Sequence, residues 1–227
     1  MLLLLTATVV MISLHESSKL AFLVGLGAFA LSYLSLRWAG SLLIVAWVLA
    51  CLAVVPASLL AHRLDLQHAT WLPGSARHRV IIWNFTAEKM LESPWIGIGA
   101  NMTYVLGPRL ERDTLRLPAE ANRTLSIHAH NIYLQTWFEL GLVGVMLLML
   151  AGLSILHAIR SLVPLVQPYA YATFASAASM AAASYGMWQY WFMALFGLCA
   201  VLFWVGARLL EKSADPSPKL EEAPKIF

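Results

Sequence analysis

Charged residues are scarce in this sequence of 227 residues: Asp, Glu, Lys and Arg make up 12%, whereas 60% of the residues are hydrophobic. Soluble domains usually carry about 25% charged residues, so the composition excludes an ordinary water-soluble domain. Several stretches approach the length of about 20 apolar residues that a helix needs to cross a bilayer. The formal charge of +3 does not by itself indicate nucleic acid as a partner. The composition therefore predicts an all-α, polytopic membrane protein.

Metal-binding and redox patterns are also missing. The two cysteines, Cys51 and Cys199, each lie inside an apolar run and form no metal or redox spacing. Both are therefore expected to be small buried hydrophobic residues. The sequence contains no Asp-x-Asp triplet. We expect neither a metal nor another cofactor.

Hydropathy predicts about six membrane spans, arranged as a helical bundle around one large polar loop. Three spans are expected in residues 1–61 and three more in residues 132–210, with the loop at 62–131. The charged, proline-containing tail at 211–227 is expected to be disordered. The first apolar stretch is too short to cross alone and lacks the features of a signal peptide. We therefore expect it to be the end of a helix that begins in a longer protein.

The short loops indicate the orientation. In a six-span arrangement, Arg37, Arg160 and Arg208 mark connections on one side of the membrane. Because the positive-inside rule weighs short loops and discounts long ones, these connections are expected in the cytoplasm. The large loop is then expected in the periplasm.

Residues 76–93 of the large loop place apolar side chains at helical spacing. Ser75 stands where it would cap such a helix, and Pro94 would end it. The simplest interpretation is an interfacial helix that caps the bundle. Three tryptophans suit a position at the membrane surface: Trp71, Trp83 and Trp95.

Arginines follow this helix at close intervals: Arg109, Arg112, Arg116 and Arg123. The guanidinium group is planar and always charged, so it binds phosphates through two parallel hydrogen bonds. Such a cluster above a membrane fits lipid headgroups as well as a substrate pyrophosphate. The residues alone leave both interpretations open.

Two histidines, His128 and His130, stand immediately before the fourth expected span. No pair of acidic residues lies nearby to complete a metal site, and a histidine at the water–membrane boundary is better placed as a general base. A histidine that merely lies at the interface is the alternative. Glu139 falls inside an apolar span, where a carboxylate must pair or face a cavity.

Several of these fragments, taken in order, resemble the O-antigen ligase and polymerase family. His130-Asn131, followed after nine residues by Gly141-Leu-Val-Gly144, resembles the family signature. Residues 79–83 resemble its Arg-x-x-x-Trp element, and residues 94–99 resemble its Pro-x-x-Gly-x-Gly turn. Ser18-Lys19 resembles its Ser-Arg pair. The resemblance covers about residues 13–160.

The resemblance implies a metal-independent, inverting glycosyltransferase of the bacterial inner membrane. Such enzymes move a glycan from undecaprenyl pyrophosphate to a sugar hydroxyl, which belongs to the lipid A core for a ligase and to a glycan for a polymerase. The implied partners are the lipid-linked glycan, its acceptor and membrane lipids. Family members have about twice as many spans as counted here. The chain is therefore expected to be the C-terminal portion of such an enzyme, and its activity alone stays open.

The resemblance also assigns roles to residues. His130 is the candidate base and Arg79 a pyrophosphate contact, with Lys19 as a second contact that keeps the charge but lacks the planar fork of arginine. The remaining candidates are pyrophosphate contacts from the loop (Arg109, Arg112 and Arg116) and supporting residues (Asn131, His128, Glu139 and Trp83).

Two other classes of protein remain as alternatives. A transporter or flippase segment would need ionisable residues and broken helices at mid-membrane, where the sequence offers only Glu139, toward one end of its span. A structural membrane subunit would leave the cationic loop and the His-Asn signature as coincidence.

Overall fold

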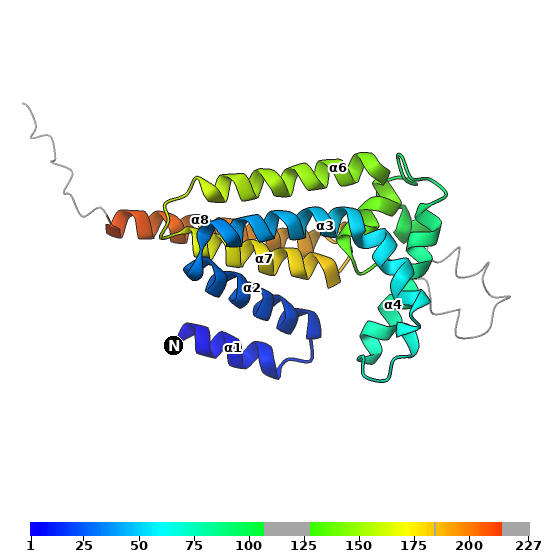
Figure 1. The fold of residues 1–227 in the computed structure, drawn as a ribbon, viewed down its shortest axis with the longest axis horizontal. Helices are drawn as coiled ribbons and strands as arrows, with labels where there is room; N and C mark the ends of the chain where they lie inside the picture. Colours follow the sequence, from blue (N-terminus) through cyan, green and yellow to red (C-terminus); the bar gives the residue numbers. More distant parts are fainter. Residues whose placement is uncertain (107–127, 184, 215–227) are drawn as a thin grey trace, which may run out of the picture.

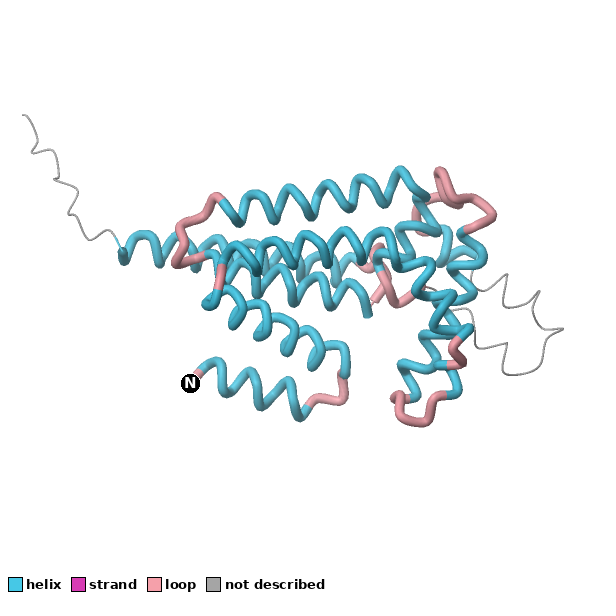
Figure 2. The backbone as a smooth tube through the Cα atoms, in the orientation of Figure 1, coloured by secondary structure: helices cyan, strands magenta, loops and turns pink. Residues whose placement is uncertain are grey.

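A computed structural model describes residues 1–106, 128–183 and 185–214 (Figure 1). The described residues form helices joined by turns and loops, with no strand among them (Figure 2). The prediction of an all-α fold is therefore confirmed. The elements in chain order are α1 (Leu2–Ile12), α2 (Glu16–Leu34), α3 (Leu36–Arg63), the short 3-10 helix η1 (Leu66–His68), α4 (Gly74–Met90), α6 (Ile132–Arg160), α7 (Gln167–Ala183) and α8 (Tyr190–Ala214).

Four of these helices are long and apolar enough to cross a membrane: α2, α3, α6 and α8. Helix α7 has 17 residues and α1 has 11, so both are shorter than a typical span. The fifth of the expected spans corresponds to α7, which begins at Gln167 after the turn that contains Pro164. The number of six spans stays a prediction.

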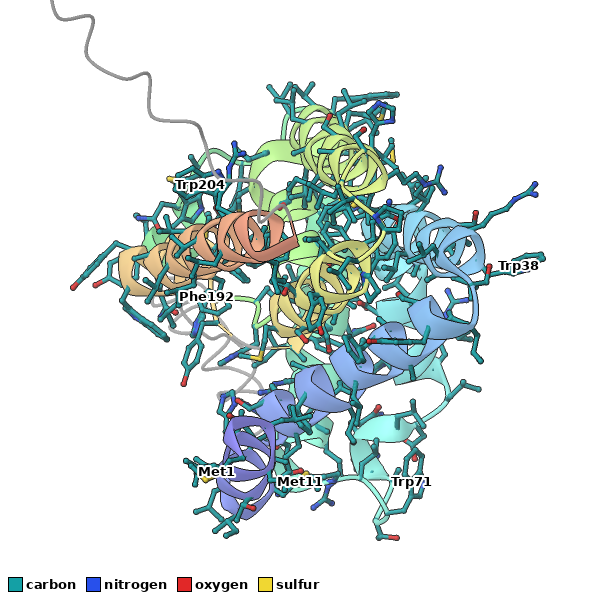
Figure 3. The ribbon with its side chains drawn as sticks, turned by 90° about the vertical axis from the view of Figure 1, so that its left-hand side faces the viewer. Met1, Met11, Trp38, Trp71, Phe192 and Trp204 are labelled. Carbon is teal, nitrogen blue, oxygen red and sulfur yellow. The ribbon has the colours of Figure 1, made fainter. Side chains whose placement is uncertain are left out.

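Helix α7 occupies the centre of the bundle. It contacts α2, α3, α6 and α8, and the end-on view shows these helices arranged around it (Figure 3). Small side chains allow a close approach: the Ser176 hydroxyl donates to the Ala21 carbonyl at 3.0 Å, and a Cβ at Gly25 would collide with the same serine. The alanine- and serine-rich sequence of α7 thus serves the close helix packing that is common in membranes.

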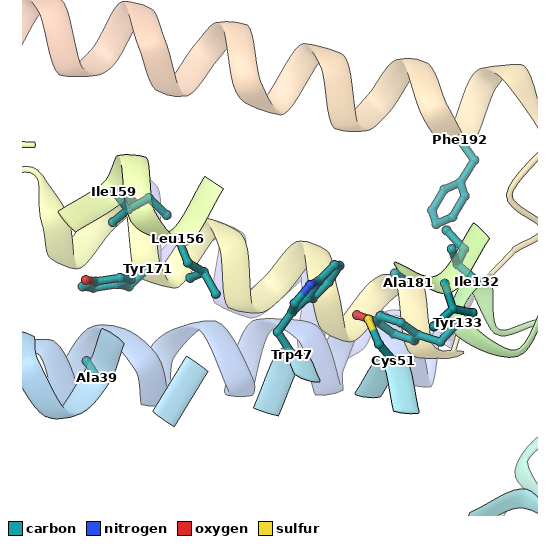
Figure 4. Close-up of a cluster of buried hydrophobic side chains, with 12 residues drawn as sticks. Ala39, Trp47, Cys51, Ile132, Tyr133, Leu156, Ile159, Tyr171, Ala181 and Phe192 are labelled. Carbon is teal, nitrogen blue, oxygen red and sulfur yellow. The ribbon is translucent and has the colours of Figure 1, made fainter. Parts of the chain in front are cut away.

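The buried centre is built around two aromatic side chains from α3 and α6 (Figure 4). The rings of Trp47 and Tyr133 meet edge to face at 5.4 Å, and the Trp47 indole N–H donates to the Met149 carbonyl at 3.1 Å. Cys51 lies fully buried beside them, as predicted. The prediction for Cys199 is wrong, because α8 contacts few other elements and this cysteine is exposed.

Helix α4 covers one end of the bundle, against α3 and α6 (Figure 1). It begins at Gly74 after Pro73, which occupies the N-cap position, so the predicted cap at Ser75 is wrong. Trp71 and Trp95, which flank the helix, expose 75% and 70% of their surface, as a helix at the membrane interface would require.

Helix α6 is broken at Gly141, whose backbone is in the left-handed region with φ of +60°. The break leaves helical N–H and C=O groups without their usual partners, and water is scarce in apolar surroundings. The turn at residues 94–99 supplies the partners. Four backbone hydrogen bonds join the two segments: Ile98 N to Phe138 O (3.1 Å), Gly99 N to Glu139 O (2.9 Å), Leu142 N to Pro94 O (2.9 Å) and Val143 N to Trp95 O (3.3 Å).

The glycines make this contact possible. A Cβ at Gly97 would lie 2.3 Å from the Glu139 carbonyl carbon, and a Cβ at Gly141 would lie 2.5 Å from the Ile96 backbone nitrogen. The Pro-x-x-Gly-x-Gly turn and the glycine that follows Glu139 and Leu140 are therefore two halves of one interlock (residues 94–99 with 138–143).

We predict that Gly141→Ala disrupts this interlock. A left-handed alanine costs about 1–2 kcal/mol, and its Cβ would also press on backbone that has no room to move. The detergent-solubilised variant should lose soluble yield and melt several degrees lower in a thermal-shift measurement. Gly27→Ala in α2 is the matched control, because its Cβ would meet nothing within 4 Å. Equal melting temperatures for Gly141→Ala and wild type would contradict the prediction.

Candidate active site

Four ring side chains gather at the end of the bundle that α4 covers. They come from three places in the chain: the N-terminus of α2, the segment before α6 and the connection between α7 and α8. The rings follow one another in a row (the ring row): His130 and His128 with centroids 4.1 Å apart, His128 and Tyr185 6.4 Å apart and nearly parallel, Tyr185 and His15 6.0 Å apart and nearly parallel.

The backbone at His130 is held from both sides. The Trp83 indole N–H, on α4, donates to the carbonyl of the buried Ala129 at 2.9 Å. Asn131 caps α6, and its side-chain oxygen accepts the Leu134 N–H at 3.1 Å. Between these anchors His130 adopts a left-handed conformation with φ of +54°. Such conformations persist where the surroundings enforce them and are frequent at functional sites.

His128 packs directly against the connection between α7 and α8. A Cβ at Gly186 would lie 2.7 Å from the His128 Cβ, so this connection passes close to His128 and leaves no room for a side chain at residue 186. Burial, and secondly the electrostatic interaction with His130, lower the pKa of His128 to about 4. His128 is therefore uncharged at neutral pH, and it presents a neutral ring to His130.

Arg79 reaches the same place from α4. Its guanidinium is half-buried, and burial lowers its pKa while the adjacent Tyr185 raises it. An arginine stays charged under such a shift. The structure thus places His130 against His128, while Tyr185, which was not predicted, interacts with both His128 and Arg79.

Lys19 forms an ion pair with Glu16 within its own helix. Its ammonium group lies 2.9 Å from the Glu16 carboxylate, in the first turn of α2. Lys19 follows His15 by one helical turn, and the His15 ring, which hydrogen-bonds Ser18 at 2.7 Å, joins the ring row. Its assignment as a pyrophosphate contact stays a prediction. The loop candidates Arg109, Arg112, Arg116 and Arg123 lie outside the described residues.

Glu139 is fully buried in α6, one turn beyond Gln135. Its carboxylate accepts four N–H donors: the backbone N–H groups of Asn101 (2.9 Å) and Thr103 (3.1 Å), the Gln135 side-chain amide (3.1 Å) and the Trp188 indole. The sequence-based requirement that this carboxylate pair or face a cavity is met by hydrogen bonding. Ionised groups are stabilised by such charge-assisted hydrogen bonds.

Sequence reasoning missed His15 and Tyr185. The available signals were their positions, because His15 stands just before the Ser-Lys fragment and Tyr185 beside the helix-breaking Gly186. Among the described residues, no group of three or more His, Cys, Asp or Glu side chains is arranged to hold a metal ion.

The site and the C-terminal end of α8 lie at opposite ends of the bundle (Figure 1). The junction of α2 with α3 at Ser35, and the turn between α6 and α7, lie at the far end with the end of α8. The cationic short connections and the ring row are therefore separated by the length of the helices, about 40 Å for a helix of 28 residues such as α3.

Comparison with known proteins gives consistent matches. The family model described as O-antigen ligase matches residues 1–149. A protein of Rickettsia conorii named "Putative polysaccharide ligase" is 31% identical over 121 residues, 52% of this chain and 29% of the relative. A protein of the same name from Rickettsia typhi is 28% identical over 134 residues, 58% of this chain and 32% of the relative.

The matched segment thus spans about a third of the length of these curated relatives. No solved structure matches the chain. The family match covers well over half of the chain and includes the interlock, Arg79 and the ring-row residues His15, His128 and His130. The chain belongs to the O-antigen ligase family.

Proposed function

We propose that this chain carries the reacting end of a membrane glycosyltransferase that moves a glycan from undecaprenyl pyrophosphate to a sugar hydroxyl. One observation carries the proposal: at one end of the bundle the His130 ring contacts His128, the His128 ring stacks with Tyr185, and Arg79 interacts electrostatically with the same tyrosine. A base and a fixed cation are the two groups that such a transfer needs. Family membership supports a glycosyl-transfer enzyme of the ligase or polymerase type.

The reaction is a displacement at the anomeric carbon. The acceptor hydroxyl oxygen forms a bond to this carbon while its proton passes to the His130 imidazole. The bond from carbon to pyrophosphate oxygen breaks, and its electron pair leaves with the pyrophosphate. A single displacement inverts the anomeric configuration. Arg79 stabilises the charge that develops on the leaving group, so the proposed step needs no metal.

The neutral His128 supports this assignment. With a pKa lowered to about 4, His128 is a weak base, so the proton is expected to move to His130. Asn131 and Trp83 hold the backbone on either side of the base.

The site lies at the end of the bundle opposite the cationic short connections, and the positive-inside rule favours these connections in the cytoplasm. The proposed location is therefore the periplasmic side of a bacterial inner membrane, within the large loop region at 62–131. The matched relatives are named polysaccharide ligases. We accordingly favour ligation, with the lipid A core as acceptor, over polymerisation.

We predict that His130→Gln lowers the rate of glycan transfer about 10²- to 10⁴-fold, the usual cost of removing a general base. The assay uses inner-membrane vesicles that contain the chain, lipid-linked donor and acceptor. His128→Gln is the matched comparison, because it removes a neighbouring ring that is already uncharged, and transfer should fall less than about tenfold. Equal effects of the two substitutions would remove His130 from the role of base.

We predict that Arg79→Gln lowers kcat/KM for the lipid-linked donor about 10²- to 10³-fold, the cost of losing one donor that stabilises developing charge. Arg79→Lys should recover part of this loss, since the charge remains but the planar fork does not. Arg63→Gln, an exposed arginine at the end of α3, is the control and should leave transfer unchanged. Full activity of Arg79→Gln at limiting donor would refute the pyrophosphate contact.

A further inference from the structure

Glu139 is fully buried in a membrane helix, where a carboxylate is costly unless it is fully hydrogen-bonded. Each of its two oxygens accepts two hydrogen bonds: Oε1 from the Thr103 N–H and the Gln135 amide, Oε2 from the Asn101 N–H and the Trp188 indole. This set of donors suits a carboxylate and no neutral side chain, because an amide would turn an NH₂ group toward N–H donors.

The donors come from separate parts of the chain. Gln135 belongs to the same helix, and its own side-chain oxygen accepts the Met187 N–H at 3.2 Å. Trp188 belongs to the connection between α7 and α8. Glu139 and Gln135 therefore bind two successive residues of this connection, Met187 and Trp188, to α6.

The same connection forms the wall of the site. Gly186 passes close to His128, and Tyr185 stacks with His128 and with His15. His128 in turn contacts His130. A continuous path of contacts thus runs from the Glu139 carboxylate, through Met187 and Trp188, to the base.

We propose that Glu139 is a positioning residue for glycosyl transfer: its carboxylate, with Gln135, clamps residues 187–188 to α6 and so fixes the wall against which the His128–His130 pair packs. The role in catalysis rests on the proposed function, whereas the clamp itself does not. Glu139 touches no reacting group, and it acts through Tyr185 and Gly186. Loss of the clamp should lower kcat more than it raises KM, because the pyrophosphate contact on α4 stays in place.

Two substitutions test the clamp, Glu139→Gln and Trp188→Phe. The first turns an amide NH₂ toward N–H donors, and the second removes one donor while keeping an aromatic ring. Glu88→Gln is the matched control, because Glu88 is exposed on α4 and, among the described residues, its carboxylate accepts a hydrogen bond only from the Asn84 side chain. Hydrogen exchange of the full chain in detergent or nanodiscs is measured for peptides covering residues 185–189 and for peptides of α2 and α7.

We expect Glu139→Gln to speed exchange at 185–189 at least tenfold and to leave α2 and α7 protected. Trp188→Phe should have the same effect on a smaller scale, and Glu88→Gln none. Unchanged exchange at 185–189 in both clamp variants would overturn the clamp. Exchange that rises equally in α2 and α7 would also overturn it, because Glu139 would then stabilise the whole fold without positioning the site.

Transfer kinetics test the consequence. Glu139→Gln should lower kcat about 10²-fold with KM for the donor within about threefold, and Trp188→Phe should lower kcat about three- to tenfold. Adding Trp188→Phe to Glu139→Gln should cost little more, since residues in one network are not additive. Faster local exchange with normal kcat would overturn the positioning role and keep the clamp. If His130→Gln transfers glycan as fast as the wild type, the proposed function fails, and the exchange experiment still decides the clamp.

Discussion

The structure depends on one backbone interlock, in which the turn at residues 94–99 fills the break in α6 at Gly141. A broken helix in apolar surroundings must find new partners for its freed N–H and C=O groups. Here the turn provides them over residues 138–143. The interlock fixes two things at once: it ties the segment that follows α4 to α6, and it places Glu139 beside residues 101–103. The hydrogen bonds around Glu139, at the end of the bundle that α4 covers, therefore depend on the interlock.

Burial of Glu139 follows from the same constraint. The interlock brings the backbone N–H groups of Asn101 and Thr103, which lie outside α6, to its carboxylate. The carboxylate then has two further acceptor positions, which the Gln135 amide and the Trp188 indole fill. A carboxylate would be costly in a membrane helix if it had no partners. Here it joins three segments, namely α6, residues 101–103 and residue 188. The glycines thus allow the interlock, the interlock supplies two of the donors that stabilise the Glu139 carboxylate, and the carboxylate holds the connection that forms part of the ring row.

The sequence predicts most of the helices, but it does not predict where they end or how distant segments contact one another. Apolar runs and their charged ends predict the helices, and the family motifs identify His130 and Arg79. The predicted helix start was less accurate, because Pro73 takes the place of Ser75 as the N-cap of α4. Exposure of Cys199 could not be predicted, since it depends on how few neighbours α8 has. His15 and Tyr185 were missed because each is an ordinary interfacial residue until folding stacks them 6.0 Å apart. Their roles arise from contacts between distant segments, which no local pattern contains.

The spacing of the Arg-x-x-x-Trp element has a physical explanation in this fold. Residues four apart on a helix lie on one face, with Cβ atoms about 5–6 Å from each other. Trp83 is bound to the Ala129 carbonyl, one residue before His130, and Arg79 stands one turn away on the same face of α4. One helical turn and one hydrogen bond therefore set the distance between the proposed cation and the proposed base. A displacement between a hydroxyl and a pyrophosphate needs such a fixed separation, because the proton acceptor and the leaving-group cation must act on opposite sides of one carbon. The rigid helix α4 fixes this separation.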